Sequence, residues 1–172
     1  METKKELKYN WYAMYTKPRW EKKVYDLLND KGIDVFLPMI TTTKVWSDRK
    51  KKVTEPLLKS YIFVKVSEKE YYDAVNTDGA VSYIRFEGKA APIPEWQIDI
   101  VKKIIEKNIA FNLSNEHFAP GEKIIIEYGD LSGQTGEIIR TKSGQKKLIV
   151  RIGELGYTLE IDSEAVGRLG GS

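Results

Sequence analysis

The sequence predicts an α+β protein in two parts, an N-terminal ferredoxin-like sandwich of strands and helices followed by a small β-barrel. In the first part, strand-like and helix-like patterns follow one another in the order β-α-β, hairpin, β-α-β, helix. Beyond Pro120 only short β runs remain, separated by turns that contain glycine. Residues 1–110 carry 21 basic and 16 acidic side chains, net +5, whereas residues 111–172 carry 7 and 9, net −2. This asymmetry indicates two units with different partners.

The first elements are a strand and a helix. Side chains alternate between two faces from Lys8 to Thr16, which is typical of a strand. Pro18 suits the first turn of a helix, where a missing N–H group costs nothing. Gly32 stands where a left-handed cap would end that helix, and Val35 to Met39 is a short strand after it. The apolar stripe of the helix consists of Trp20, Val24, Leu27 and Leu28.

A basic β-hairpin is expected next. Thr41 to Trp46 and Lys51 to Leu57 are two extended arms, and Ser47-Asp48-Arg49 between them has turn chemistry. Five basic residues and one acidic residue give residues 44–52 a net charge of +4. A tip of this kind either contacts phosphate groups or is simply solvated, and the sequence leaves both open.

Two strands and two helices complete the first part. Tyr61 to Val66 is a strong β run, and Val81 to Phe86 is another. Between them, Ser67 and Glu70 have the spacing of a capping box before a short helix that Asp78-Gly79 ends. The last helix is opened by Pro94, and its apolar side consists of Ile98, Val101, Ile104 and Ile105.

The pattern changes near residues 109–117, where periodic apolar residues are few, so we expect a linker there. The predicted limits are 8–108 for the first domain and 118–168 for the second. The β runs of the second domain are Ile124 to Ile126, Ile138-Ile139, Leu148 to Val150 and Tyr157 to Leu159.

The composition gives little support for catalysis. The chain has no cysteine, which excludes disulfides, thiolate metal sites and cysteine nucleophiles. Its single histidine, His117, lies in the expected linker, and no phosphate-binding, dinucleotide-binding or nucleophile-elbow motif occurs. No apolar run reaches transmembrane length, and no signal-peptide core is present. We expect a cytoplasmic protein that is not an enzyme, with no catalytic residues, no metal, no cofactor and no membrane partner.

Two clusters are candidates for binding. Lys17, Arg19, Lys22 and Lys23 lie at the start of the first helix, where they either contact phosphate groups or are solvated. A second cluster is apolar and crosses from a hairpin arm into the next strand. It is either a protein-docking patch or ordinary sheet core, and its members are Leu57, Leu58, Tyr61 and Phe63.

Several motifs, taken in order, resemble the NusG family. W-Y-A-M-Y-T-K-P-R at Trp11 to Arg19 is similar to the opening of the family's N-terminal (NGN) domain, and E-P-L-L-K-S-Y-I-F-V at Glu55 to Val64 is a second hallmark. A-P-I-P at Ala91 to Pro94 is a third. F-A-P-G-E-K at Phe118 to Lys123, with G-D-L-S-G-Q-T-G at Gly129 to Gly136, resembles the start of a KOW domain, an SH3-like barrel. Within the family, the resemblance is closest to specialised antiterminators of the RfaH and UpxY type, which act on long operons such as those for surface polysaccharides.

The resemblance implies a monomeric transcription elongation and antitermination factor. In the family, an apolar patch of the N-terminal domain docks on the clamp helices of the largest RNA polymerase subunit and suppresses pausing. The positions that match this patch are Leu58, Tyr61 and Phe63, with Tyr83 and Ile84 on a neighbouring strand. Relatives often have an aromatic residue where this chain has Leu58, and Pro-Gly or Pro-Asn where it has Lys59-Ser60.

The resemblance also implies contacts with DNA and with a second protein. Specialised paralogues read non-template DNA, and the family also lies near upstream DNA. The DNA-binding candidates are Lys17, Arg19, Lys22 and Lys23, together with Tyr71 and Tyr72, which either stack on bases or pack in the core. The KOW domain recruits the termination factor Rho or a small-subunit ribosomal protein, and Leu131 and Ser132 match its partner-binding loop. General NusG proteins usually have a bulky aromatic residue there.

The resemblance also bears on the form of the C-terminal domain. Glu55 matches an interdomain ion-pair partner in relatives whose C-terminal domain is helical. The six glycines from Gly129 to Gly156 would each weaken a helix by about 1 kcal/mol, so we expect a β-barrel.

Two alternative functions stay open. The binding-module alternative is an RNA- or ribosome-binding KOW protein that does not bind polymerase. The enzyme alternative requires a cleft of acidic residues that the sequence does not reveal.

Overall fold

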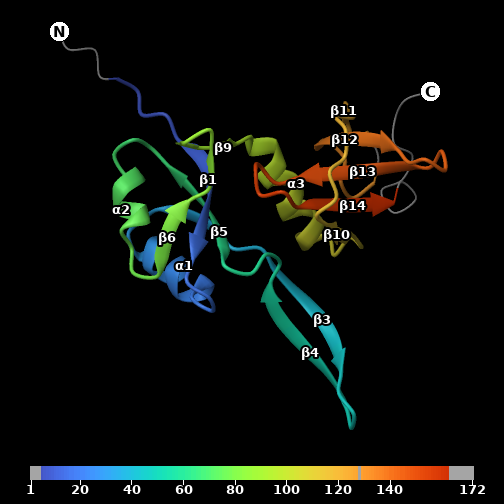
Figure 1. Ribbon diagram of the computed structural model, residues 1–172, viewed down its shortest axis with the longest axis horizontal. Helices are drawn as coiled ribbons and strands as arrows, with labels where there is room; N and C mark the ends of the chain where they lie inside the picture. Colours follow the sequence, from blue (N-terminus) through green and yellow to red (C-terminus); the bar gives the residue numbers. More distant parts are fainter. Residues whose placement is uncertain (1–4, 128, 163–172) are drawn as a thin grey trace. The chain divides into compact units, whose positions relative to one another are not determined.

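The structure is a computed structural model that describes residues 5–127 and 129–162. The chain divides into two compact units, one ending at Pro92 and the other beginning at Ile93, and each is described by itself. Figure 1 labels the elements of both units. The mixed α and β architecture that the sequence predicts is confirmed.

The first unit is built on an antiparallel sheet. Its strand order is β2 (Asp34–Phe36), β5 (Tyr61–Val66), β1 (Asn10–Thr16) and β6 (Ala80–Tyr83), and β9 (Pro92–Ile93) also pairs with β1. Helices α1 (Glu21–Asp30) and α2 (Tyr71–Val75) cover one face. The core between them includes Met14, Ile62 and Val64 from the sheet, with Val24, Leu28 and Ala74 from the helices.

Helix α1 starts later than predicted and ends where predicted. Arg19 adopts a left-handed backbone conformation, with φ of 66°, so a helix opened at Pro18 is not possible and α1 begins at Glu21. At the other end, the Ile33 N–H donates to the Leu28 carbonyl at 3.1 Å, and the Gly32 N–H donates to the Asn29 carbonyl at 2.9 Å. With Gly32 at φ of 75°, this is a Schellman cap, and the predicted role of Gly32 is confirmed.

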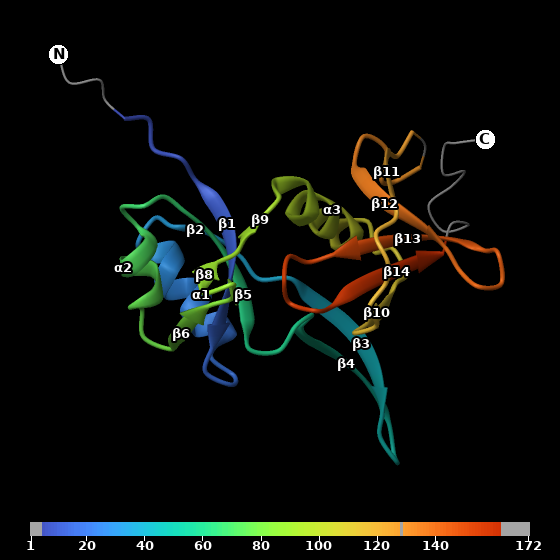
Figure 2. The same cartoon turned by 45° about the horizontal axis from the view of Figure 1, so that its top comes forward.

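The predicted basic hairpin is confirmed. Strands β3 (Met39–Val45) and β4 (Lys50–Pro56) form a separate two-stranded sheet in which Val45 pairs with Lys50. The Trp46 N–H donates to the Arg49 carbonyl at 2.8 Å and closes the turn. Figures 1 and 2 show this ribbon extending away from the main sheet of the first unit.

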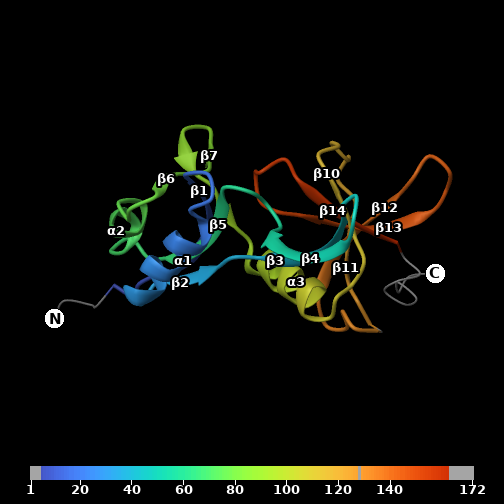
Figure 3. The ribbon, with the colours of Figure 1, turned by 90° about the horizontal axis from the view of Figure 1, so that it is seen from below.

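The segment around α2 and β6 differs from expectation in two places. The Glu70 carboxylate accepts the Ser67 N–H at 3.2 Å, so half of the capping box forms, while the buried Ser67 Oγ has no partner among the described residues. The strand predicted over Val81 to Phe86 is too long, because β6 ends at Tyr83. Strands β7 (Arg85–Phe86) and β8 (Lys89–Ala90) pair with each other and form a short separate hairpin (Figure 3). Its two turn residues have φ of 52° and 80°, typical of a type I′ turn, and they are Glu87 and Gly88.

The second unit contains helix α3 (Glu95–Glu106) and an antiparallel five-stranded sheet. The strand order is β10 (Asn112–Ser114), β14 (Thr158–Asp162), β13 (Lys146–Arg151), β12 (Thr135–Arg140) and β11 (Glu122–Ile125). Helix α3 contacts β12 and β13, and the Gln97 side-chain oxygen accepts the Gly153 N–H at 2.8 Å. All four predicted β runs contribute to strands.

Two features of the second unit depart from the prediction. Its ladder ends at β10 and β11, so within the described part of the unit the sheet is open and no closed barrel is found. The expected linker contains β10, which pairs with β14. This compact unit includes α3, whereas the predicted N-terminal domain runs to residue 108; the predicted limits 8–108, 109–117 and 118–168 stay a prediction.

Candidate functional site

The face of the first sheet opposite α1 and α2 carries a pair of tyrosines. Tyr15 on β1 and Tyr61 on β5 are direct cross-strand partners. Their ring centroids lie 5.5 Å apart in an edge-to-face arrangement, and Tyr15 is 36% exposed. Sequence reasoning selected Tyr61 but missed Tyr15, because alternation shows which face a residue takes and not which strand lies beside it.

Leu58 and Phe63 lie close to this pair but are buried. Phe63 is the partner of Ala13 on β1 and of Phe36 on β2, and the two phenylalanine ring centroids are 6.1 Å apart. Phe63 is 0% exposed and Leu58 only 3% exposed. Of the predicted patch, Tyr61 is therefore the member on this face that solvent reaches, with Tyr15 extending it.

Tyr83 lies on the other face of the sheet and does not join this surface. It pairs with Met14, whose side chain belongs to the core beneath the helices. Its ring stacks on Tyr71 with a centroid distance of 4.3 Å, and its hydroxyl donates to the Tyr71 carbonyl at 2.6 Å. Burial raises the pKa of the Tyr83 phenol well above its ordinary value. Ile84 is half-buried, and its N–H donates to the Ala13 carbonyl at 2.9 Å.

A buried carboxylate positions the loop before β5. Glu21, at the start of α1, is 7% exposed, and its Oε1 accepts the Ser60 N–H at 2.8 Å. The Ser60 carbonyl accepts the Thr16 N–H at 2.8 Å, and Ser60 has φ of 66°. Glu21 thus fixes the strained turn that joins Leu58 to Tyr61. The only signal in the sequence was the position of an acidic residue at a helix N-terminus.

The basic cluster at α1 converges on an indole. The amino groups of Lys17 and Lys23 lie 5.2 Å and 4.2 Å from the centroid of the Trp20 ring. Beneath that ring is Gly79, with φ of 87°, and a Cβ placed there would collide with Trp20. The Lys17 N–H donates to the Gly79 carbonyl at 2.9 Å. This hydrogen bond joins the segment that carries Lys17 to the residue before β6.

The other two basic candidates are placed differently. Arg19 and Lys22 are both exposed. Lys22 lines a shallow apolar hollow with Tyr25, Phe36 and Met39. The structure therefore brings Lys17 and Lys23 together and leaves Lys22 outside that pair.

Tyr71 and Tyr72 form an edge-to-face pair with a centroid distance of 5.2 Å. Tyr72 is 72% exposed, whereas Tyr71 is half-buried, and burial raises the pKa of Tyr71 above its ordinary value. Both line a hollow of about 410 Å³ together with Tyr12 and Ser67, whose Oγ has no partner among the described residues. Tyr71 thus serves mainly in packing, and Tyr72 is the ring available to a ligand.

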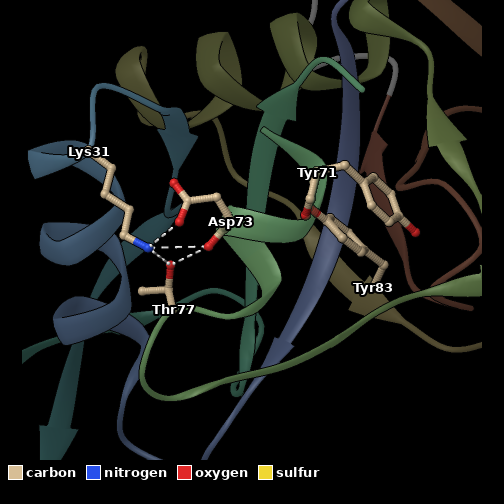
Figure 4. A network of polar contacts seen from close by, with 5 residues as sticks. All are labelled: Lys31, Tyr71, Asp73, Thr77 and Tyr83. Carbon is tan, nitrogen blue, oxygen red and sulfur yellow. Dashed lines mark hydrogen bonds and ion pairs between the residues drawn. The ribbon is translucent and has the colours of Figure 1, made fainter. Parts of the chain in front are cut away.

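Polar contacts hold α2 against α1 (Figure 4). The Lys31 amino group lies 2.9 Å from an Asp73 carboxylate oxygen and 3.1 Å from the Thr77 hydroxyl. It also donates to the Asp73 carbonyl at 3.2 Å. Since Lys31 is the C-terminal cap of α1, this network fixes the short helix that carries the two tyrosines.

In the predicted partner-binding loop of the second unit, only one of the two candidate residues is exposed to solvent. Leu131 is 0% exposed, and Ser132 is exposed with its hydroxyl donating to the Glu127 carbonyl at 3.0 Å. The Leu131 side chain thus serves the core of the described structure.

The described residues contain neither a membrane-spanning helix nor a cluster of metal ligands. In residues 5–127 and 129–162 no helix is long and apolar enough to cross a membrane. Over the same ranges, no group of three or more histidine, aspartate or glutamate side chains is arranged to hold a metal ion.

Comparison with known proteins gives a family and several solved structures. The family model described as transcription termination factor NusG matches residues 9–102. A solved structure described as the domain interaction in Thermotoga maritima NusG is 16% identical, covers 95% of this chain and 98% of that chain, and has a TM-score of 0.48. An MjSpt4:Spt5 complex in conformation A is 13% identical, covers 91% and 96%, and has a TM-score of 0.29.

Proposed function

This chain belongs to the NusG family of transcription factors, and we propose that it is an elongation and antitermination factor of the specialised RfaH and UpxY type. The family binds RNA polymerase, and its members are generally not enzymes. The matched residues, 9–102, include every element of the first unit's sheet.

The proposed polymerase contact is the tyrosine pair on the sheet face opposite α1 and α2, supported by the buried Leu58 and Phe63. The observation that supports it best is the edge-to-face pairing of Tyr15 with Tyr61, because it places two amphipathic rings side by side at the surface. Such rings have an apolar body and a polar tip, which suits a contact that forms and dissociates in water. The proposed partner is the pair of clamp helices of the largest subunit.

The proposed DNA contact uses the other side of the same unit. Lys17 and Lys23 supply positive charge around Trp20, and Tyr72 presents an exposed ring. Cations contact phosphate groups, and an exposed ring stacks on an unpaired base. Non-template or upstream DNA is the proposed ligand. The second unit is proposed to recruit a partner, Rho or a small-subunit ribosomal protein, with Ser132 as the exposed residue of the loop.

Co-elution of the purified protein with a bacterial elongation complex tests the polymerase contact. We expect the wild type to co-elute and the double variant Tyr15→Ala/Tyr61→Ala to lose most of its binding while keeping its circular dichroism spectrum. The matched control is Tyr9→Ala/Phe86→Ala, because Tyr9 is 46% exposed and Phe86 is 55% exposed, away from the pair. Equal binding by both double variants would contradict the assigned face, and RNA binding without polymerase binding would favour the RNA-binding alternative.

A further inference from the structure

The tip of the β3–β4 ribbon is exposed on both sides. Its two strands form a sheet that pairs with no other strand in the described chain. Trp46 is 57% exposed and the neighbouring Val45 is 74% exposed. Burial within the protein therefore contributes little free energy at Trp46. The exposed indole is available to a ligand.

The register places the indole among cations. Trp46 and Arg49 close the turn, and the next pair along the ribbon is Val45 opposite Lys50, followed by Lys44 opposite Lys51. Since side chains alternate along a strand, Trp46, Arg49 and Lys51 share one face of the ribbon. Lys50 and Lys52 lie on the other face, opposite Val45 and Thr43.

Most of this charge is not neutralised. Lys44 forms an ion pair with Glu55 at 3.4 Å, but the other four basic residues of the tip have no ion pair within the described ranges. Asp48 is the one acidic residue of the stretch 44–52, whose net charge is +4. An anionic ligand with repeated charges is therefore attracted to this tip.

We propose that the ribbon tip binds an unpaired nucleic-acid strand, with a base stacked on Trp46 and the flanking phosphates held by Arg49 and Lys51. Bases offer a flat aromatic surface whatever their sequence, and phosphates match the guanidinium of Arg49 geometrically. The phosphates of a duplex can also contact these basic side chains, but its bases are stacked on one another, so their faces are not available to Trp46. This contact adds a second nucleic-acid site to the proposed function, and it does not depend on polymerase docking.

Fluorescence anisotropy with a fluorescein-labelled thymidine 15-mer, and with a duplex of equal length, tests the proposal. The variant Lys17→Ala/Lys23→Ala serves as the background, so that the other basic cluster does not mask the tip. In this background we expect the unpaired strand to bind more tightly than the duplex. Trp46→Leu should weaken binding of the unpaired strand at least about fivefold and leave duplex binding unchanged, since stacking contributes roughly 1–3 kcal/mol per base.

The phosphate contacts are tested by the salt dependence. Arg49→Ala/Lys51→Ala should reduce the slope of log affinity against log salt by about 1.4, because each contact with a single strand contributes about 0.7. The matched control, Lys69→Ala/Lys142→Ala, removes the same charge at two exposed residues outside the tip and should leave the slope nearly unchanged. All substituted side chains are exposed, and thermal unfolding checks that the fold is intact.

Three results would overturn the proposal: no measurable binding of the unpaired strand in the background protein, unaltered affinity in Trp46→Leu, or equal changes of slope in the tip and control variants. None of them bears on co-elution with polymerase, so the tip and the proposed function fail separately.

Discussion

Glu137 on β12 and Arg151 on β13 form a two-pronged ion pair, with Nε to Oε2 at 3.0 Å and Nη2 to Oε1 at 3.1 Å. Glu137 Oε1 also accepts the Gly121 N–H at 2.6 Å, and Arg151 Nη2 donates to the Ala119 carbonyl at 2.9 Å. The pair thus fastens the segment before β11 to the middle of the second unit's sheet.

Replacing Glu137 with glutamine should destabilise the protein by about 1–3 kcal/mol at pH 7, because the half-buried Arg151 guanidinium and the Gly121 N–H lose their charged acceptor. Burial alone would raise the pKa of Glu137, but hydrogen bonds from Arg151 and Gly121 outweigh it and hold that pKa below its ordinary value. The stabilisation is therefore present above the ordinary carboxyl pKa and is lost as the pH falls below it. Urea unfolding at pH 7 and pH 3 measures both effects; a difference from the wild type that persists undiminished at pH 3 would contradict this account.

Replacing Tyr83 with phenylalanine should weaken the protein by about 1 kcal/mol at pH 7, since the bond to the Tyr71 carbonyl is lost. The raised pKa of Tyr83 means that the folded state favours the neutral phenol. The stabilisation is complete below the ordinary tyrosine pKa of about 10 and is lost as the pH rises beyond it. Unfolding measured at pH 8 and pH 11 should show a smaller alkaline loss for Tyr83→Phe than for the wild type. Tyr72→Phe is the control, because the Tyr72 ring is exposed.

Replacing Gly79 with alanine should be far more damaging than the same change at Gly88. Both have a left-handed backbone, with φ of 87° and 80°, so both variants carry the same conformational strain. At Gly88 the added methyl group meets open space, whereas at Gly79 it meets the Trp20 ring. Overpacking of this kind costs about 1–3 kcal/mol beyond the strain. Thermal unfolding of the two variants measures the difference, and similar melting temperatures would show that Trp20 is not held against Gly79.

Replacing Glu21 with alanine should loosen the turn before β5. The Ser60 N–H would lose its acceptor, at a cost of about 1–3 kcal/mol, and its hydrogen exchange should accelerate. Glu68→Ala is the matched control, because the Glu68 side chain is 84% exposed and its ion pair with Lys5 should contribute little. Amide exchange of Ser60 that is as slow in Glu21→Ala as in the control would show that another group holds the turn.

Local periodicity was sufficient for much of the fold. The strong β run Tyr61 to Val66 coincides with β5, and the turn residues between the arms of the basic hairpin lie where the chain reverses. Local periodicity did not predict elements that are too short to show a repeating pattern of apolar residues. The strands β7, β8 and β10 have only two or three residues each, and Arg85 and Phe86 were read as a continuation of β6.

The candidate site shows the same division. The sequence by itself determined the residue types: apolar and aromatic side chains before and within β5, and lysines around the start of α1. Only the tertiary structure decided which of them meet. Because β1 lies between β5 and β6, Tyr61 gained Tyr15 as its neighbour, while Tyr83 faces the helices. Alternation records which side chains share a face within one strand, but pairing between strands depends on the free energy of packing the whole sheet, which no single segment contains.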